Sequence, residues 1–117
     1  MPGLTTHILD TANGCPAGGV KIELFKHSGG VCTKMREVTT NQDGRTDAPL
    51  LSSEHLVPNT YELLFHVGDY LRQKGMDLPE QPFFDVVPVR FSIHDDTQHY
   101  HVPLLVSPWG YTTYRGS

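Results

Sequence analysis

Apolar side chains recur at every second position in four separate stretches of the 117-residue chain. This period of two is typical of a strand with one face in a protein core, because successive side chains of a strand point to opposite faces. Turn-forming pairs such as Asn13-Gly14 and Asp43-Gly44 interrupt the chain and keep each strand short. Short alternating strands with turns between them predict an all-β fold, an antiparallel sandwich or barrel. The alternating stretches are residues 20–26, 61–67, 87–93 and 100–106.

Two local patterns complete the expected architecture. Residues 26–31 contain two successive glycines and predict a hairpin loop, because glycine supplies the positive φ that a tight turn needs. Residues 52–56 begin with serines followed by Glu54, which favours one helical turn that Pro58 would end. The sequence therefore predicts about seven or eight strands and one short helix in a single domain of residues 1–117.

Charge and composition exclude several classes of protein. The net charge is −4, whereas a nucleic-acid-binding domain of this size is normally basic. The chain has no apolar run near 18 residues, which argues against a membrane span, and its first residues do not resemble a secretory signal. Cys15 and Cys32 fit no disulfide framework, so we expect two free thiols in a reducing cytoplasm.

The seven histidines are unusual in so short a chain. His99 and His101 share one face of a predicted strand, an arrangement that can hold a metal if a third ligand such as His7 lies nearby. Metal-free acid–base chemistry by His7 and His101 would need the same convergence, because imidazole titrates near neutral pH. The residues alone leave both alternatives open. The remaining histidines are interpreted as ordinary: His27, His55, His66 and His94.

The surroundings of these histidines predict self-association. Strand alternation places His7 on a face with Leu9, and His101 on a face with Leu105. If both faces point away from the core, the resulting surface is too apolar to remain in water. We therefore expect oligomerisation across it.

Four segments resemble, in the same order, those of the 5-hydroxyisourate hydrolases, also called transthyretin-related proteins. The resemblance extends over nearly the whole chain, and the ending Tyr-Arg-Gly-Ser is its most specific part because it must close the chain to count. The segments are Leu4–Asp10 followed by Gly14–Ala17, then Pro88–Phe91, His99–Leu105 and Ser107–Ser117.

The resemblance implies a fold, an assembly and a reaction. The fold is a transthyretin-like antiparallel β-sandwich of two four-stranded sheets with one short helix. Subunits pair edge to edge, and two dimers stack into a homotetramer with active sites in the central channel. The reaction is hydrolysis of 5-hydroxyisourate to 2-oxo-4-hydroxy-4-carboxy-5-ureidoimidazoline in urate degradation, without a metal or organic cofactor. The alternative is a non-catalytic transthyretin-like carrier of a small ligand, but transthyretin lacks these histidines and this ending.

The resemblance also assigns roles to residues. The catalytic set is His7, His101 and Arg45, of which one histidine takes a proton from water and the arginine stabilises the oxyanion. We expect His101 to be the base and His7 its partner, although the two roles are interchangeable. His99 stands next to this motif without an assigned role. The substrate-binding residues are Tyr114, Arg115, Gly116 and Ser117.

Overall fold

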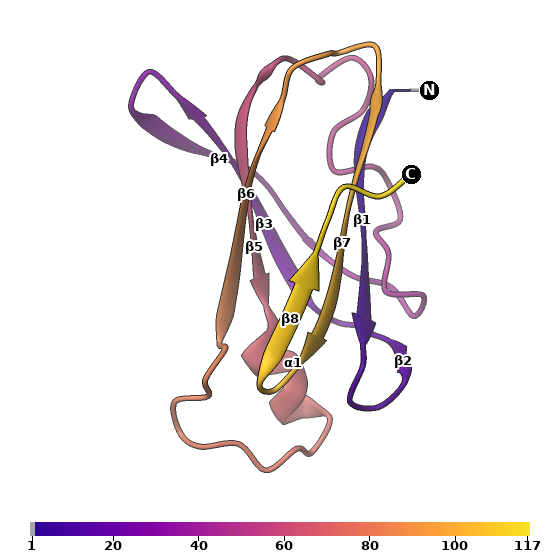
Figure 1. The fold of residues 1–117 in the computed structure, drawn as a ribbon, viewed down its shortest axis with the longest axis vertical. Coiled ribbons are helices and arrows are strands. Elements are labelled where there is room, and N and C mark those ends of the chain that lie inside the picture. The colour runs from indigo at the N-terminus through magenta and orange to yellow at the C-terminus, as the bar shows by residue number, and fades with distance from the viewer. Residues whose placement is uncertain (1) are drawn as a thin grey trace.

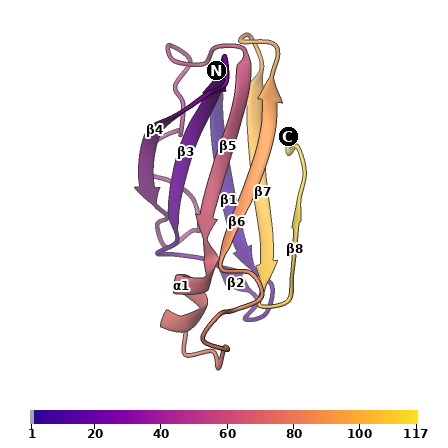
Figure 2. The ribbon, with the colours of Figure 1, turned by 90° about the vertical axis from the view of Figure 1, so that its left-hand side faces the viewer.

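The computed structural model describes residues 2–117, which form two four-stranded sheets packed face to face with a helix at one end (Figure 1). The first sheet contains, in spatial order, β2 (Cys15–Pro16), β1 (Gly3–Asp10), β7 (His99–Ser107) and β8 (Gly110–Thr113). The second sheet contains, in spatial order, β4 (Val31–Thr39), β3 (Lys21–Ser28), β5 (Asn59–His66) and β6 (Val86–Ile93). The end strand β8 lies at one margin of the molecule, beside β7 and β6 (Figure 2).

The predicted sandwich of two four-stranded sheets is confirmed, with one difference in strand direction. Every neighbouring pair is antiparallel except β1 and β7, which run parallel. In this pair Thr5 lies opposite His101, and His7 lies opposite Pro103. Because residues opposite each other in a sheet point to the same side, the register decides which side chains of the two strands meet.

The alternating residues fill one hydrophobic core between the sheets. In β5, for example, Tyr61, Leu63 and Phe65 are fully buried, as the period of two predicts. The hairpin between β3 and β4 is also as predicted. Its two turn residues, Gly29 and Gly30, have φ angles of 58° and 79°, which L side chains rarely adopt.

The short helix predicted over residues 52–56 is wrong. Ser52 and His55 instead close a turn, in which the backbone N–H of His55 donates to the Ser52 carbonyl at 3.0 Å. The hydroxyl of Ser52 lies 2.9 Å from Nδ1 of the His55 ring. A serine that bonds locally in this way offers the backbone an alternative to a helix, which is why an N-cap signal alone is insufficient.

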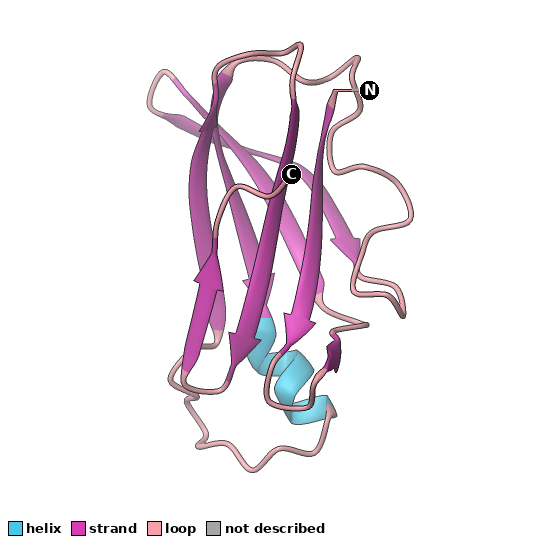
Figure 3. Cartoon of the chain, turned by 45° about the vertical axis from the view of Figure 1, so that its right-hand side comes forward, coloured by secondary structure: helices cyan, strands magenta, loops and turns pink. Residues whose placement is uncertain are grey.

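The helix lies elsewhere, as α1 (Val67–Gln73), directly after β5 and at the end of the sandwich away from the N-terminus (Figure 3). Its buried residues Val67, Tyr70 and Leu71 have the i, i+3, i+4 spacing of an amphipathic helix. The Tyr70 hydroxyl donates to Oδ2 of Asp10 at 2.7 Å, which ties the helix to the end of β1. Within residues 2–117, no helix has the length and apolar character needed to cross a membrane.

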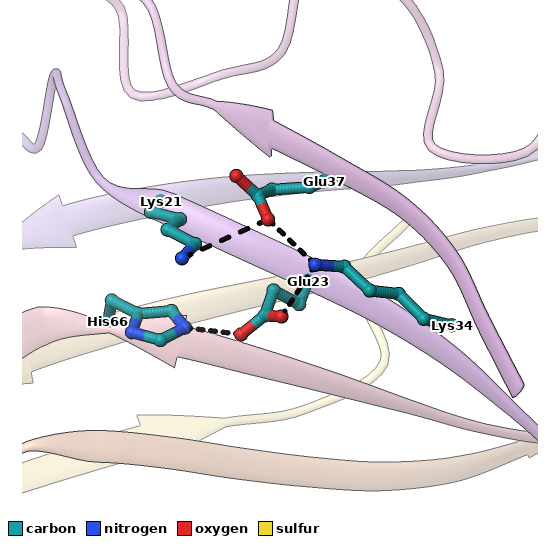
Figure 4. A network of polar contacts seen from close by, with 5 residues as sticks. All are labelled: Lys21, Glu23, Lys34, Glu37 and His66. Carbon is teal, nitrogen blue, oxygen red and sulfur yellow. Dashed lines mark hydrogen bonds and ion pairs between the residues drawn. The ribbon is translucent and has the colours of Figure 1, made fainter. Parts of the chain in front are cut away.

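The outer face of the second sheet carries a network of charged side chains (Figure 4). Glu23 and Glu37 lie opposite each other on β3 and β4, a position in which like charges repel. The ammonium of Lys34 lies between them, 2.9 Å from Glu23 and 2.7 Å from Glu37. Nε2 of His66 lies 2.6 Å from the other oxygen of Glu23, and Lys21 reaches Glu37 at 3.8 Å. The hydrogen bonds from Lys34 and His66 lower the pKa of Glu23 to about 2.

A β-bulge allows this network to form. Lys34 and Glu37 are three residues apart, so a regular strand would point them to opposite faces. Arg36 and Lys34 lie opposite two consecutive residues of β3, so Met35 between them has no partner in the pairing. The extra residue returns both charged side chains to the outer face.

Replacing Glu23 tests the network. A carboxylate whose pKa is lowered in the folded state stabilises the fold above its ordinary pKa of 4.5, and this contribution disappears as pH falls toward 2. We expect Glu23→Gln to lower the free energy of unfolding by about 1 kcal/mol at pH 7. The difference from the unsubstituted chain should shrink between pH 4.5 and 2, as measured by urea unfolding at equal protein concentration. Glu54→Gln, in an exposed turn, is the control, and a pH-independent difference for Glu23→Gln would contradict the prediction.

Candidate active site

The β1–β7 pair presents a polar face on the side away from the core. Thr5 and His7 on β1 and His101 on β7 are half-buried, and His99 is exposed, whereas the residues between them in sequence are buried. The parallel register places all of them on one face, because Thr5 is opposite His101 and residues two apart share a side. The predicted convergence of His7 and His101 on an outward face is therefore present. The two histidines are diagonal neighbours across the pair, because His7 is two residues beyond Thr5, the residue opposite His101.

The loop after β4 brings Arg45 to the same face. The carbonyl of Gly44 accepts the backbone N–H of Ile8 at 2.8 Å, which attaches the loop to β1. Gly44 has a φ of 72°, and a side chain there would collide with the carbonyl oxygen of Ile8. The side-chain oxygen of Asn41 accepts the N–H groups of Asp43 at 2.9 Å and of Arg45 at 3.2 Å. These bonds fix the backbone from which the arginine side chain projects.

Burial and nearby positive charge act together on the two histidines. Burial lowers the pKa of His7 below its ordinary value of 6.5, and the Arg45 guanidinium lowers it further against the opposing effect of Asp43. Burial likewise lowers the pKa of His101, with further contributions from Arg45, His7 and His99. Both imidazoles are therefore neutral at pH 7 and able to accept a proton. The shared influence of Arg45 shows that its charge lies near both rings.

The hydroxyl of Thr5 connects two histidines of β7. Its oxygen lies 2.8 Å from Nδ1 of His101 and 2.9 Å from Nε2 of His99. This contact fixes the orientation of the His101 ring. Within residues 2–117, no hydrogen bond engages Nε2 of His101, so this nitrogen is available for chemistry.

The C-terminal tail passes over His101. The backbone N–H of Gly116 donates to the His101 carbonyl at 2.7 Å. A Cβ atom at Gly116 would lie 2.6 Å from Cδ2 of the His101 ring, so only glycine allows the tail to come this close. The tail thereby covers one edge of the imidazole.

Arg115 anchors the tail to the rest of β7. Its guanidinium donates to the His99 carbonyl at 3.1 Å and to the side-chain oxygen of Gln98 at 3.0 Å. It also lies over the ring of Tyr100, with Cζ 4.3 Å from the ring centroid, which is a cation–π geometry. These contacts hold the side chain of Arg115, and with it the tail, against the start of β7.

The four tail residues predicted to bind substrate do not all lie beside His101. Gly116 lies against His101. Tyr114 and Arg115 line a cavity of about 320 Å³ between β6 and β8, and neither His7 nor His101 lines it. Ser117 is exposed at the end of the tail.

A smaller cavity, of about 190 Å³, lies beside Arg45 and is lined also by Thr5, Thr6 and residues 46–49. Pockets for small molecules generally have volumes of about 300–1,000 Å³. One chain thus provides only part of a binding site at this face. Within residues 2–117, the structure brings together no group of three or more His, Cys, Asp or Glu side chains that could hold a metal ion.

Sequence reasoning missed two residues of the site, Thr5 and Asn41. The role of Thr5 depends on the parallel register of β1 with β7, for which the sequence has no visible signal. Asn41 did carry a signal, because an asparagine two residues before Asp43-Gly44 is typical of a side chain that caps its own turn.

Removing the charge of Arg45 tests the electrostatics of the site. In Arg45→Gln the charged form of each imidazole is no longer opposed by the guanidinium, so the pKa values of His7 and His101 should rise toward 6.5. Titration of the histidine ring signals by NMR measures this change. Arg90→Gln, on the outer face of the second sheet, removes an equal charge elsewhere and should leave both values unchanged. Unchanged pKa values in Arg45→Gln would show that Arg45 does not act on the histidines.

Comparisons with known proteins agree with this fold. The model of the HIUase/Transthyretin family matches residues 4–116. The 5-hydroxyisourate hydrolase 2 of Rhizobium meliloti is 54% identical over 114 residues, which are 97% of this chain and 95% of that protein. The crystal structure of an (S)-allantoin synthase matches with a TM-score of 0.93 and 44% identity, over 99% of this chain and 44% of the other. The 5-hydroxyisourate hydrolase structure from Klebsiella pneumoniae matches with a TM-score of 0.82 and 32% identity over the whole of both chains. The chain therefore belongs to the HIUase/Transthyretin family.

Proposed function

We propose that this chain, as one transthyretin-like domain of residues 1–117, hydrolyses 5-hydroxyisourate to 2-oxo-4-hydroxy-4-carboxy-5-ureidoimidazoline in urate degradation. The observation that carries the proposal is the convergence of His7, His101 and Arg45 at one face of the β1–β7 pair. Relatives named 5-hydroxyisourate hydrolase support the choice of substrate. We further propose that the reaction uses no metal or organic cofactor and takes place in the cytoplasm, with neither nucleic acid nor a membrane as a partner.

The chemistry begins with a neutral imidazole. The substrate is a planar oxidised purine, and its ring opens when water attacks a ring carbonyl and the adjacent C–N bond breaks. His101 takes a proton from the attacking water through its available Nε2, a step that contributes about 10²–10⁴-fold to the rate. The lowered pKa of His101 keeps it in the accepting form at pH 7. His7, which is also neutral because its pKa is lowered, is the partner that receives this proton from His101 and gives a proton to the leaving ring nitrogen.

Arg45 stabilises the negative charge that develops on the carbonyl oxygen. A guanidinium held in place before the reaction stabilises an oxyanion without needing to reorganise, which makes such a group effective in catalysis. The hydrogen bonds of the Asn41–Arg45 turn support this role, because they fix the backbone of Arg45 in the free protein.

The tail residues Tyr114, Arg115, Gly116 and Ser117 complete the proposed substrate site. Gly116 supports this role directly, because it lies against the His101 ring. Tyr114 and Arg115 line the cavity between β6 and β8, so we propose that they contribute by holding the tail and by contacting substrate in the assembled enzyme.

We also propose that the working unit is a homotetramer, a dimer of dimers. The strands β6 and β8 end their sheets and line the same cavity, so both can pair edge to edge with a second copy. Beside them Phe83 and Trp109, each 67% exposed, contact each other with ring centroids 5.8 Å apart. Two such dimers would stack through the face that bears Leu9, Leu105 and the histidines, which would enclose the partial cavity beside Arg45.

An assay of the freshly generated substrate tests the proposed activity. Urate oxidase forms 5-hydroxyisourate in the cuvette, and the purified chain should accelerate its decay. His101→Asn and His7→Asn should each lower kcat by about 10²–10⁴-fold, because each removes a proton-transferring group. His55→Asn, in an exposed turn, is the matched control and should have normal activity.

Other outcomes of this assay have definite meanings. Tight binding of an aromatic ligand without turnover would favour the transthyretin-like carrier over the enzyme. Stoichiometric bound metal together with loss of activity on chelation would overturn the metal-free reaction. Full activity in both histidine variants would show that the site is elsewhere.

Sedimentation equilibrium tests the assembly. The chain should sediment with four times its subunit mass of 13.1 kDa. Phe83→Glu places a charge in the proposed edge-to-edge contact and should dissociate the tetramer. Val31→Glu is the control, because Val31 is similarly exposed, at 62%, in the distant β3–β4 hairpin. A tetramer that persists in Phe83→Glu would contradict the proposed edge-to-edge pairing.

A further inference from the structure

Thr5 places its hydroxyl oxygen between two imidazoles, 2.8 Å from Nδ1 of His101 and 2.9 Å from Nε2 of His99. We propose that Thr5 and His99 form a proton relay behind His101, so that the positive charge generated when His101 activates water is transferred to His99. This inference rests on the proposed hydrolase function and adds two residues to its machinery.

A threonine hydroxyl has one proton to donate and lone pairs to accept one. Placed between two ring nitrogens, it therefore donates to one and accepts from the other. When it accepts from Nδ1–H of His101 and donates to Nε2 of His99, the proton of neutral His101 is on Nδ1. Nε2 of His101 is then a free base pointing away from Thr5. This arrangement is the one that the proposed hydrolysis needs.

The transfer conserves protons and charge. Water gives a proton to Nε2 of His101 as its oxygen bonds to the substrate carbonyl carbon. His101 passes its Nδ1 proton to the oxygen of Thr5, and Thr5 passes its hydroxyl proton to Nε2 of His99. At the end His101 is neutral with its proton on Nε2, Thr5 is a hydroxyl again, and His99 is the imidazolium. The reverse transfer returns the proton to His101, whose Nε2 gives it up, and His7 passes a proton on to the leaving ring nitrogen.

The surroundings of the two rings explain why the charge would move. His101 is half-buried, and burial, Arg45, His7 and His99 all oppose a positive charge on it. His99 is exposed on the same strand, where water can solvate an imidazolium. Arg115 approaches His99 from the tail, but it binds the backbone carbonyl and lies over the Tyr100 ring.

The fold leaves room for His99 to reach Thr5. In the parallel register the residue opposite His99 is Gly3, two positions before Thr5 on the same face. A Cβ atom at Gly3 would lie 3.8 Å from Nδ1 of His99 and 3.1 Å from the Leu51 carbonyl oxygen. The distance to the ring is ordinary van der Waals contact, so the His99 ring lies over Gly3 of β1 with its Nε2 beside the Thr5 hydroxyl.

A double-mutant cycle tests the relay by kinetics. Thr5→Val keeps the shape of the side chain and removes the hydroxyl, and we expect kcat to fall at least 10-fold with KM nearly unchanged. Thr5→Ser should restore most of the rate. His99→Gln should produce a loss similar to that of Thr5→Val, and the double variant should be no slower than either single variant, because both changes break one pathway. The matched control is Thr60→Val, which changes a threonine of β5 in the second sheet.

The kinetic outcome separates the relay from the proposed function. Suppose that His101→Asn abolishes the activity, whereas Thr5→Val or His99→Gln retains it in full. This result would overturn the relay and leave the proposed hydrolase function in place. Multiplicative losses in the double variant would also overturn it, because independent roles are multiplicative in rate.

NMR tests the hydrogen bonds without any turnover. The ¹⁵N shifts of the neutral wild-type rings should show His101 protonated on Nδ1, and Thr5→Val should change the titrations of His99 and His101 together. A neutral His101 protonated on Nε2, or unchanged titrations in Thr5→Val, would contradict the relay even if the chain hydrolyses no 5-hydroxyisourate.

Discussion

The parallel pairing of β1 with β7 is the constraint on which the site depends. It joins the first strand of the chain to the seventh, and its register sets Thr5 opposite His101 and His7 opposite Pro103. A shift of one residue would turn every side chain of β1 to the opposite face and bury His7 in the core. Burial of Leu4 and Ile8 between the sheets opposes such a shift, because both are fully buried in the observed register. The hydrophobic core thus holds the histidines in place.

The two outer faces of the sandwich have different chemistry. On the second sheet, Glu23 and Glu37 are neutralised by Lys34 and its neighbours, which leaves a solvated surface of paired charges (Figure 4). On the first sheet, Arg45 stands beside two half-buried imidazoles whose pKa values are lowered, so its charge is not neutralised by them. Arg45 is exposed in the single chain, so its guanidinium is solvated there and available to stabilise an anion bound at this face. The asymmetry supports placing catalysis on the first sheet.

Much of the fold was predictable because it depends on local patterns. Alternation located the strands around Leu63 and Leu104, and the glycines after Ser28 located a hairpin. The helix was misplaced because the alternation of β5 continues through Val67, so the change to a helical period there was not recognised. The site was only partly predictable. The outward direction of His7 followed from alternation, but the meeting of Thr5 with two imidazoles depends on a register between strands far apart in sequence, which no local pattern records.

A subunit with this face exposed is incomplete in a way that favours assembly. The cavity beside Arg45 is smaller than most small-molecule pockets, and only β1 and the loop of residues 45–49 line it. A second copy facing it would supply the missing wall, remove water from both sets of histidines and further disfavour their charged forms. The cost of charging His101 would then be greater than in the single chain, so a route that moves the proton to another imidazole becomes more valuable in the assembly. His99 suits this role because it lies at the start of β7, beside the tail that covers His101, and is exposed to water.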